Sequence, residues 1–210
     1  MWHVRLYQPA DRPVVFQLCG DMAHFGDPIE HFFDARELFL DAFAVYYTDV
    51  ADDHLWVAED DRGDIVGYLM GCPDTLAYNR WFREHARTMA RRFITLHYRG
   101  LTRKTLGFIW RYLRLRVPHL DLSDYPAHLH INTRADVRGN GVGTALMHMY
   151  LAQLRRENVP GVHLETSSMN TIAVPWYEKL GFQLLQRVTT DLYTPSVGHP
   201  IDLLVYGMRL

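Results

Sequence analysis

Hydrophobic residues recur along this chain with two spacings, every second residue in some segments and every third or fourth in others. The first spacing predicts strands and the second predicts helices, and the two follow one another in mixed order. Residues 3–7 alternate at every second position, as in a strand, and the apolar positions after Pro9 keep helical spacing. Similar patterns predict strands at 55–58, 65–70, 127–133, 162–166, 183–188 and 203–208, with helical segments between them. The pattern therefore predicts an α/β (α+β) fold.

The segment at about residues 74–117 has a different character. It contains no proline and keeps helical spacing, so we expect two helices broken near Gly100. Residues 80–116 hold eleven Arg and Lys and one acidic residue, whereas residues 11–64 hold fourteen Asp and Glu and three Arg. The two regions are oppositely charged, so the acidic region offers an internal partner to the basic helices.

Length and composition limit the class of protein. With 210 residues and 48% hydrophobic residues, the chain is expected to form one domain whose core needs neither disulfides nor metal. Cys19 and Cys72 lie far apart in the sequence, which favours free thiols and a reducing compartment. We find no secretory leader and no apolar segment of membrane-spanning length, so we expect a cytoplasmic protein without a membrane partner.

A glycine-rich segment, Arg138–Gly143, lies between a predicted strand and a predicted helix. Glycines let the backbone approach a ligand, and the free N–H groups of the first helical turn favour an anion. A dinucleotide-binding fold also uses alternate glycines, but there the first glycine comes one place earlier in the first βα unit, with an acidic residue about 20 positions on. The segment therefore predicts a phosphate site of another kind.

Arg138, Gly141 and Gly143 match the signature of the GNAT acetyltransferase family, and residues 170–182 match a second motif of that family, which has Asn, Ala, Tyr and Gly-Phe in this order. The chain resembles this family over most of its length. The resemblance implies the GNAT fold, with a central mixed, mostly antiparallel sheet flanked by helices and a basic helical insert before the acetyl-CoA-binding strand. Residues 68–75 and 125–132 also resemble a bacterial subgroup related to the acetyltransferase-like C-terminal domain of O-GlcNAcase.

The resemblance implies a set of contacts to acetyl-CoA (CoA). The strand would offer backbone groups to the pantetheine arm, the glycine loop would hold the pyrophosphate, and Asn170 would bind the pantetheine. Tyr177 would protonate the departing thiolate, unless it is a buried aromatic residue that packs on the sheet. The cofactor residues expected on these grounds are Ile131, Asn132, Thr133, Arg138, Gly139, Asn140, Gly141, Val142, Gly143, Thr144, Asn170 and Tyr177.

The general base and the acceptor-binding residues are less constrained. Glu165 matches a strand position where some family members place a catalytic glutamate, although others use that position structurally. His130 and His128 share one face of the strand before the loop. His130 is a candidate base and His128 a candidate substrate-binding residue, and the alternative for both is a hydrogen-bonded core residue. Asp74 can bind a cationic amine or cap a helix. The remaining histidines lack the spacing of metal ligands, so no metal is expected.

Three functions are compatible with these motifs. The first is an N-acetyltransferase that transfers the acetyl group by direct attack of a primary amine in a ternary complex, on a small molecule or on a protein lysine or N-terminus. The second is an acetyl-CoA-binding domain with little or no catalysis. The third is an interaction module that uses the basic insert, although we do not expect nucleic acid as a partner. A homodimer is compatible with the sequence.

Overall fold

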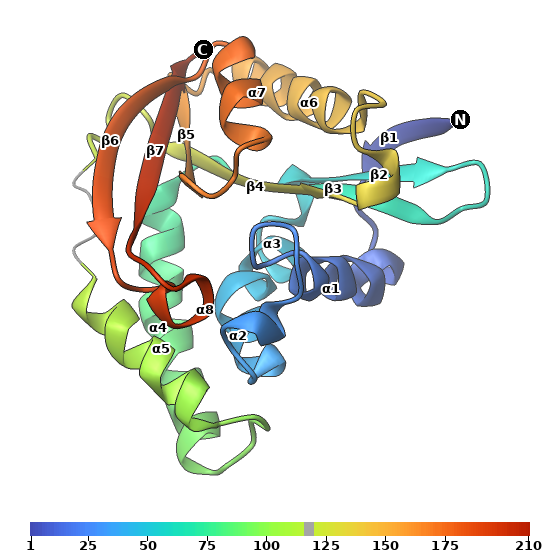
Figure 1. Ribbon diagram of the computed structural model, residues 1–210. Helices are drawn as coiled ribbons and strands as arrows, with labels where there is room; N and C mark the ends of the chain where they lie inside the picture. Colours follow the sequence, from blue (N-terminus) through green and yellow to red (C-terminus); the bar gives the residue numbers. More distant parts are fainter. Residues whose placement is uncertain (116–119) are drawn as a thin grey trace.

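The segments with alternating hydrophobicity form one seven-stranded sheet in the computed structural model, which describes residues 1–115 and 120–210 (Figure 1). The strands are β1 (Trp2–Leu6), β2 (Leu55–Asp60), β3 (Ile65–Cys72), β4 (Ala127–Thr133), β5 (Gly161–Ser167), β6 (Gln183–Thr190) and β7 (Ile201–Arg209). Their order is β1-β2-β3-β4-β5-β7-β6. All neighbours are antiparallel except β4 and β5, which confirms the expected mixed, mostly antiparallel sheet.

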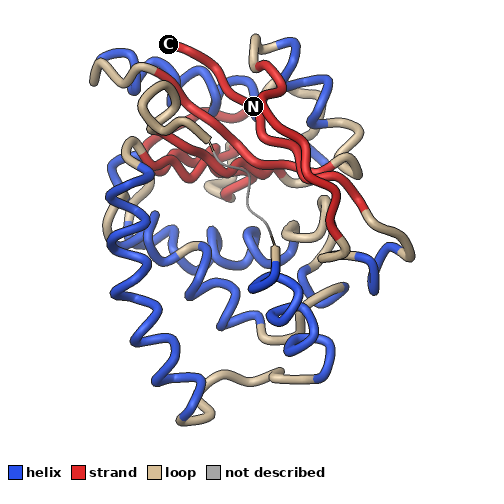
Figure 2. The backbone as a smooth tube through the Cα atoms, turned by 90° about the vertical axis from the view of Figure 1, so that its left-hand side faces the viewer, coloured by secondary structure: helices blue, strands red, loops and turns tan. Residues whose placement is uncertain are grey.

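Helices cover both faces of this sheet, as Figures 1 and 2 show. One face carries α6 (Val142–Arg156) and α7 (Ala173–Lys179). The other carries α1 (Arg12–Asp21), α2 (Arg36–Phe43), α3 (Val45–Asp49), α4 (Thr75–Ile94) and α5 (Arg103–Arg114), and α8 (Thr194–Val197) lies between β6 and β7. Short 3₁₀ turns are η1 (Pro9–Asp11), η2 (Ile29–His31), η3 (Asp52–His54) and η4 (Ala135–Val137).

Each face of the sheet has its own hydrophobic core. On one side Leu146 and Tyr150 of α6 are fully buried against the sheet, and the Tyr150 hydroxyl donates to the carbonyls of Cys72 and His128. On the other side Tyr47 and Tyr68 are buried beneath α1 and α3. Because both faces are covered, the central strands are held in fixed register, and they position the residues of the site described below.

The basic insert packs against the acidic region. Arg92 of α4 lies 2.5 Å from the carboxylate of Asp41, and the Tyr98 hydroxyl donates to the same carboxylate. The Lys104 amine of α5 lies 2.5 Å from the Asp34 carboxylate. The expectation of an internal partner is therefore confirmed, and α4 and α5 are the two helices expected on either side of Gly100.

We expect the free energy of unfolding of an Asp41→Asn variant to be about 1–3 kcal/mol lower than that of the wild type. The reason is that Arg92 and Tyr98 lose a charged hydrogen-bond acceptor. Burial alone would raise the pKa of Asp41, but the bonds from Tyr98 and Arg92 outweigh it and leave the pKa below its usual value. This stabilisation is present above the unfolded-state pKa of about 3.9 and is lost as pH falls through the folded-state pKa.

Thermal unfolding of the wild type and of Asp41→Asn between pH 3 and pH 8 measures this effect. The difference between the two proteins should be full at neutral pH and should shrink below about pH 4. Asp64→Asn, which removes an exposed carboxylate, is the control and should change little. A difference between wild type and Asp41→Asn that does not depend on pH would contradict the account of the Asp41 cluster.

The helix that carries Tyr177 contains a proline near its start. Proline inside a helix commonly kinks or breaks it, but α7 begins at Ala173 and includes Pro175 as its third residue. The N–H groups of the first helical turn have no partner within the helix, so a proline there costs no helical hydrogen bond. α7 therefore contains Pro175 without a break. The expected end of the insert at Val117 and the break at Pro118 lie outside the described residues.

Candidate active site

The parallel pair in the centre of the sheet opens after two residues. β4 and β5 are paired at Ala127 with Val162 and at His128 with His163. Along its other edge, β4 stays paired with β3 as far as Thr133. The remainder of β4 therefore presents one edge of backbone groups to a gap between β4 and β5.

The register identifies which residues face this gap. The backbone N–H of Arg134 donates to the Val66 carbonyl of β3 at 2.8 Å. Backbone groups alternate along an antiparallel strand, so Asn132 and His130 also direct theirs to β3, whereas Ile131 and Thr133 direct theirs to the gap. Ile131 and Thr133 thus offer backbone groups to the gap, and their contact with a pantetheine arm stays a prediction.

Asn132 requires a correction. Its backbone groups face β3 and are not offered to the gap. Its side-chain amide donates to the Tyr68 hydroxyl at 2.8 Å on the α1 side of the sheet. The sequence could not reveal this, because only the register shows which residues of a strand turn their backbone groups to a given neighbour.

The glycine loop follows β4 directly and leads into α6. Gly139 and Gly141 have φ values of 80° and 84°, and α6 begins at Val142. No atom of residues 1–115 or 120–210 lies within 4 Å of the position that a Cβ on Gly139 would take, so the described loop surface is open at this residue. The amides of the first turn of α6 point out of the helix end and favour an anion.

Two contacts hold the loop next to the gap. Arg138 Nε donates to the Thr133 carbonyl at 3.3 Å, which ties the exposed Arg138 to the end of β4. Trp176 Nε1 of α7 donates to Thr144 Oγ1 at 3.2 Å. Asn170 lies before α7, and its side-chain amide donates to Thr166 Oγ1 at 3.5 Å. The remaining expected cofactor residues lie in this loop and in the first turn of α6.

Tyr177 is a buried residue of α7, with 6% of its surface exposed. Its ring contacts Phe182 and Tyr206, and it belongs to the same cluster as Leu129 of β4 and Leu164 of β5. Tyr177 therefore lies in the core on the α6 and α7 side of the sheet, against Tyr206 of β7. Burial raises the pKa of Tyr177 well above its usual value, so the phenol keeps its proton throughout the physiological range.

Three histidines lie on the opposite face of β4 and β5. The ring of His128 lies 5.9 Å from that of His130 and 5.6 Å from that of His163, measured between centroids. The shared face of His128 and His130 is therefore confirmed.

Both ring nitrogens of His128 are occupied by the protein. Thr75 Oγ1 donates to the Pro126 carbonyl, so His128 Nδ1 donates to Thr75 Oγ1 at 2.7 Å. His128 Nε2 then accepts from the Tyr47 hydroxyl at 2.7 Å. Because both nitrogens are used, neither is free to bind an acceptor substrate. His128 is therefore a hydrogen-bonded core residue, the alternative given for it from the sequence.

His130 and Asp74 are also placed by the fold. Burial lowers the pKa of His130 to about 3, so its ring is a weak base at neutral pH. The Asp74 carboxylate accepts from the Ala77 N–H at 3.0 Å and caps α4, which is the structural alternative noted from the sequence. Neither residue suits the role of general base as well as Glu165 does.

Glu165 of β5 is exposed, yet desolvation raises the pKa of its carboxyl. Desolvation of an exposed carboxyl means that many protein atoms lie around it. The carboxylate in turn contributes to raising the pKa values of Tyr78, Tyr112 and Tyr193, after the larger effect of burial. We use the name acceptor recess for Glu165 together with these three tyrosines, with which it interacts electrostatically.

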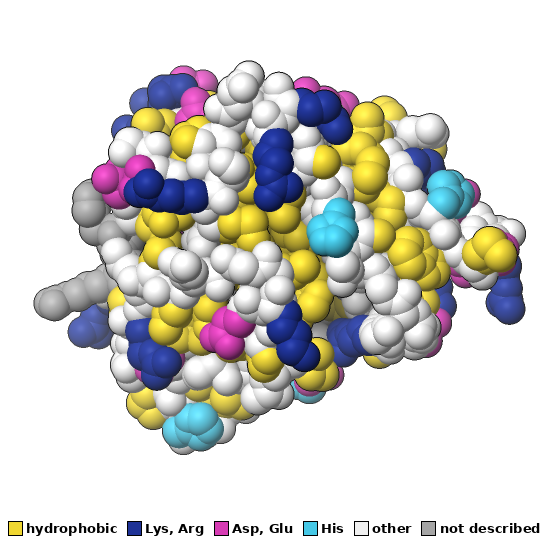
Figure 3. Space-filling model, turned by 90° about the horizontal axis from the view of Figure 1, so that it is seen from above, with side chains coloured by type: hydrophobic (Ala, Val, Ile, Leu, Met, Phe, Trp, Pro, Cys, Tyr) yellow, Lys and Arg dark blue, Asp and Glu magenta, His cyan; other side chains and the backbone are white. Residues whose placement is uncertain are grey.

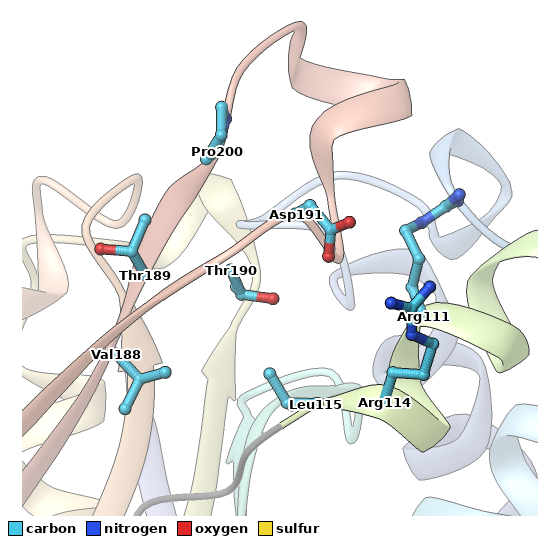
Figure 4. Close-up of a pocket in the computed structure, with 8 residues that line it drawn as sticks. All are labelled: Arg111, Arg114, Leu115, Val188, Thr189, Thr190, Asp191 and Pro200. Carbon is cyan, nitrogen blue, oxygen red and sulfur yellow. The ribbon is translucent and has the colours of Figure 1, made fainter.

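The insert builds part of this recess. Tyr78 belongs to α4 and Tyr112 to α5, while Tyr193 follows β6. A pocket of about 440 Å³ has a different lining, in which Arg111 and Arg114 of α5 face the end of β6 near Asp191 (Figure 4). The sequence alone assigns no role to Tyr78, Tyr112 or Tyr193.

The basic side chains form no continuous surface on the face that carries α6 and α7, where they are mixed with acidic and hydrophobic ones (Figure 3). Among the described residues, no helix combines the length and apolar character that crossing a membrane requires.

Comparison with known proteins agrees with this geometry. Residues 25–182 match the model of the acetyltransferase (GNAT) family. A crystal structure described as that of SsHAT is 30% identical, with a TM-score of 0.73 over 99% of this chain and 98% of that chain. The fold is shared with yncA of Salmonella typhimurium, solved with its cofactor acetyl-CoA, at 13% identity and a TM-score of 0.62 over 100% and 94% of the two chains. It is also shared with the ribosomal-protein-alanine N-acetyltransferase of Brucella melitensis, at 15% identity and a TM-score of 0.59 over 99% of each chain.

Proposed function

The chain belongs to the acetyltransferase (GNAT) family, whose members use acetyl-CoA, and from that premise we propose that it acetylates a primary amine by direct attack in a ternary complex. The observation that carries this proposal is the gap between β4 and β5, which leads directly to the glycine loop. One elongated ligand with a pyrophosphate at the loop and a thioester at the gap would use both features.

Acetyl-CoA fits the groups that line these features. The amides of the first turn of α6 would bind the pyrophosphate, and Ile131 and Thr133 would offer backbone groups to the pantetheine arm. Asn170 would add a side-chain contact at the opposite side of the gap. Acetyl-CoA supplies the activated acetyl group, and the protein supplies its placement.

The proton acceptor and the proton donor of the proposed reaction lie on opposite faces of the sheet. On the recess side, Glu165 would accept one proton from the ammonium group, and the amine nitrogen would then attack the thioester carbon. The second proton that the nitrogen loses as the amide forms would pass to water. The N–H of Thr133 would bind the oxyanion. As the carbon–sulfur bond breaks, Tyr177 on the α7 side would give its proton to the thiolate. Because burial raises the pKa of the phenol, Tyr177 would be a weaker acid than an exposed tyrosine.

The recess favours an amine that arrives as a cation. Glu165 interacts electrostatically with Tyr78, Tyr112 and Tyr193, and both a carboxylate and aromatic rings attract an ammonium group. The raised pKa of Glu165 brings its carboxyl closer to the range of an effective base at neutral pH. Small amines, a protein lysine and a protein N-terminus share this chemistry.

We expect Tyr177→Phe to lower kcat about tenfold and to leave the Kd of acetyl-CoA unchanged. The effect is modest because a thiolate, whose conjugate acid has a pKa of about 8.5, leaves without a proton at limited cost. Steady-state assays with a panel of small amines and lysine peptides, combined with calorimetric titration of acetyl-CoA, measure the two quantities separately.

Tyr7→Phe is the matched control, since Tyr7 is also buried but lies in the core on the other face of the sheet. It should leave kcat unchanged. If wild-type protein binds acetyl-CoA but acetylates no amine of the panel, the acetyl-CoA-binding function without catalysis replaces the enzymatic one.

A further inference from the structure

Three potential metal ligands meet in the segment between α1 and α2. Each of His24, Asp27 and His31 offers one ligand atom, and these atoms all lie within 4.8 Å of one another. Two backbone bonds of 2.9 Å join His24 to Asp27 across a tight turn, and Gly26 has a φ of 103° there. The turn η2 then brings His31 back, with its ring centroid 5.4 Å from that of His24.

The hydrogen bonds of His24 determine its tautomer. The Ser196 hydroxyl of α8 donates to the Tyr193 carbonyl at 2.9 Å, so Ser196 Oγ accepts from His24 Nε2 at 3.1 Å. His24 Nδ1 therefore carries a lone pair and no proton. His24 is 6% exposed, and within residues 1–115 and 120–210 its Nδ1 has no hydrogen-bond partner.

A buried nitrogen lone pair without a partner is costly, unless a ligand occupies it. A metal-binding histidine typically donates its other ring N–H to an oxygen, which fixes the tautomer, and Ser196 accepts the Nε2–H of His24 in this way.

We propose that His24, Asp27 and His31 bind a Zn²⁺ ion, with Ser196 orienting His24. Two imidazoles and one carboxylate are a common three-residue zinc set, and the fourth position remains open to water. Bonds of about 2.0–2.2 Å to zinc place tetrahedral ligand atoms about 3.3 Å apart, so the three groups must approach by about 1.5 Å at most. Asp27 and His31 are exposed and can rotate to do so.

The ion would fix a segment that touches both parts of the candidate active site. A Cβ on Gly26 would lie 3.1 Å from the Arg138 guanidinium of the glycine loop. On the other side, Tyr193 of the acceptor recess contacts the rings of His24 and Phe25. Zinc would therefore hold the α1–α2 segment between the loop and the recess, and binding of the ion itself does not depend on acetyl transfer.

The test uses the full chain after treatment with a chelator. Calorimetric titration with Zn²⁺ should show one ion per chain, and Co²⁺ in its place should give the visible absorption bands of a tetrahedral site. His31→Ala and Asp27→Asn change exposed residues and should fold, yet each should lose this binding. His148→Ala removes an exposed histidine of α6 and should keep it.

Ser196→Ala retains all three ligands but removes the acceptor for His24 Nε2–H, so zinc should bind about 10- to 100-fold more weakly. Zinc should also raise the Tm of the wild type and not that of His31→Ala. Equal affinity in the wild type and His31→Ala, or no stoichiometric binding to the wild type, would overturn the site. Unchanged affinity in Ser196→Ala would overturn the role of Ser196.

Discussion

Replacing Gly139 by aspartate is expected to weaken acetyl-CoA binding about 10- to 100-fold relative to replacing it by asparagine. The two side chains have the same shape, and both tolerate the positive φ of 80° at this residue. No atom of the described residues lies within 4 Å of the position of the new Cβ. Only aspartate places a negative charge beside the bound pyrophosphate, and a repulsion of about 1–3 kcal/mol corresponds to that loss.

Calorimetric titration of both variants with acetyl-CoA measures the ratio. Aspartate near the N-terminus of α6 should stabilise the helix, so thermal unfolding should show that the Asp variant is at least as stable as the Asn variant. The ratio between the acetyl-CoA Kd values of the Asp and Asn variants should also fall towards one at high salt, where charges are screened. Equal affinities for the two variants at low salt would show that the phosphates do not bind at this loop.

Glu165→Gln is expected to lower kcat by about 10²- to 10⁴-fold, the usual contribution of a general base. The Kd of acetyl-CoA should stay the same, because Glu165 belongs to the recess on the other face of the sheet. In the wild type, activity should rise with pH through the raised pKa of Glu165, since the base must be ionised. The variant should lack this rise.

Two further measurements separate this role from a structural one. Glu84→Gln, which changes an exposed carboxylate on α4, should keep full activity. A raised pKa in the folded state means that ionisation of Glu165 destabilises the fold, so the Gln variant should gain stability relative to the wild type at pH 8 and not at pH 4. Full activity of Glu165→Gln with every amine would remove Glu165 from the mechanism.

The sequence predicted the elements that depend on local pattern. Some strands, such as β1, alternate with period 2, whereas β3 is a continuous buried run. The helix after the glycine loop begins at Val142, directly after the glycines. The two motifs of the family also placed the loop next to the strand that lines the gap. Charge alone predicted that the basic insert would meet an acidic partner, and Asp41 and Asp34 are two such partners.

Features that depend on register and on distant contacts were not accessible in this way. The direction of the Asn132 backbone follows from the pairing of β4 with β3 and not from residue type. The acceptor recess joins Tyr78 and Tyr112 of the insert to Tyr193, which is far along the chain. His24 and Asp27 are close in sequence, but the tautomer that prepares His24 for a metal is set by Ser196, 172 residues away.

The most direct test of the acetyl-CoA site is a crystal structure of the wild-type protein with acetyl-CoA. We expect the pantetheine arm between β4 and β5, hydrogen-bonded to backbone groups of Ile131 and Thr133 but not to those of Asn132, with the pyrophosphate at the amides of Gly139–Thr144 and the thioester between Tyr177 and Glu165. A complex in which acetyl-CoA lies elsewhere and the gap stays empty would contradict the account.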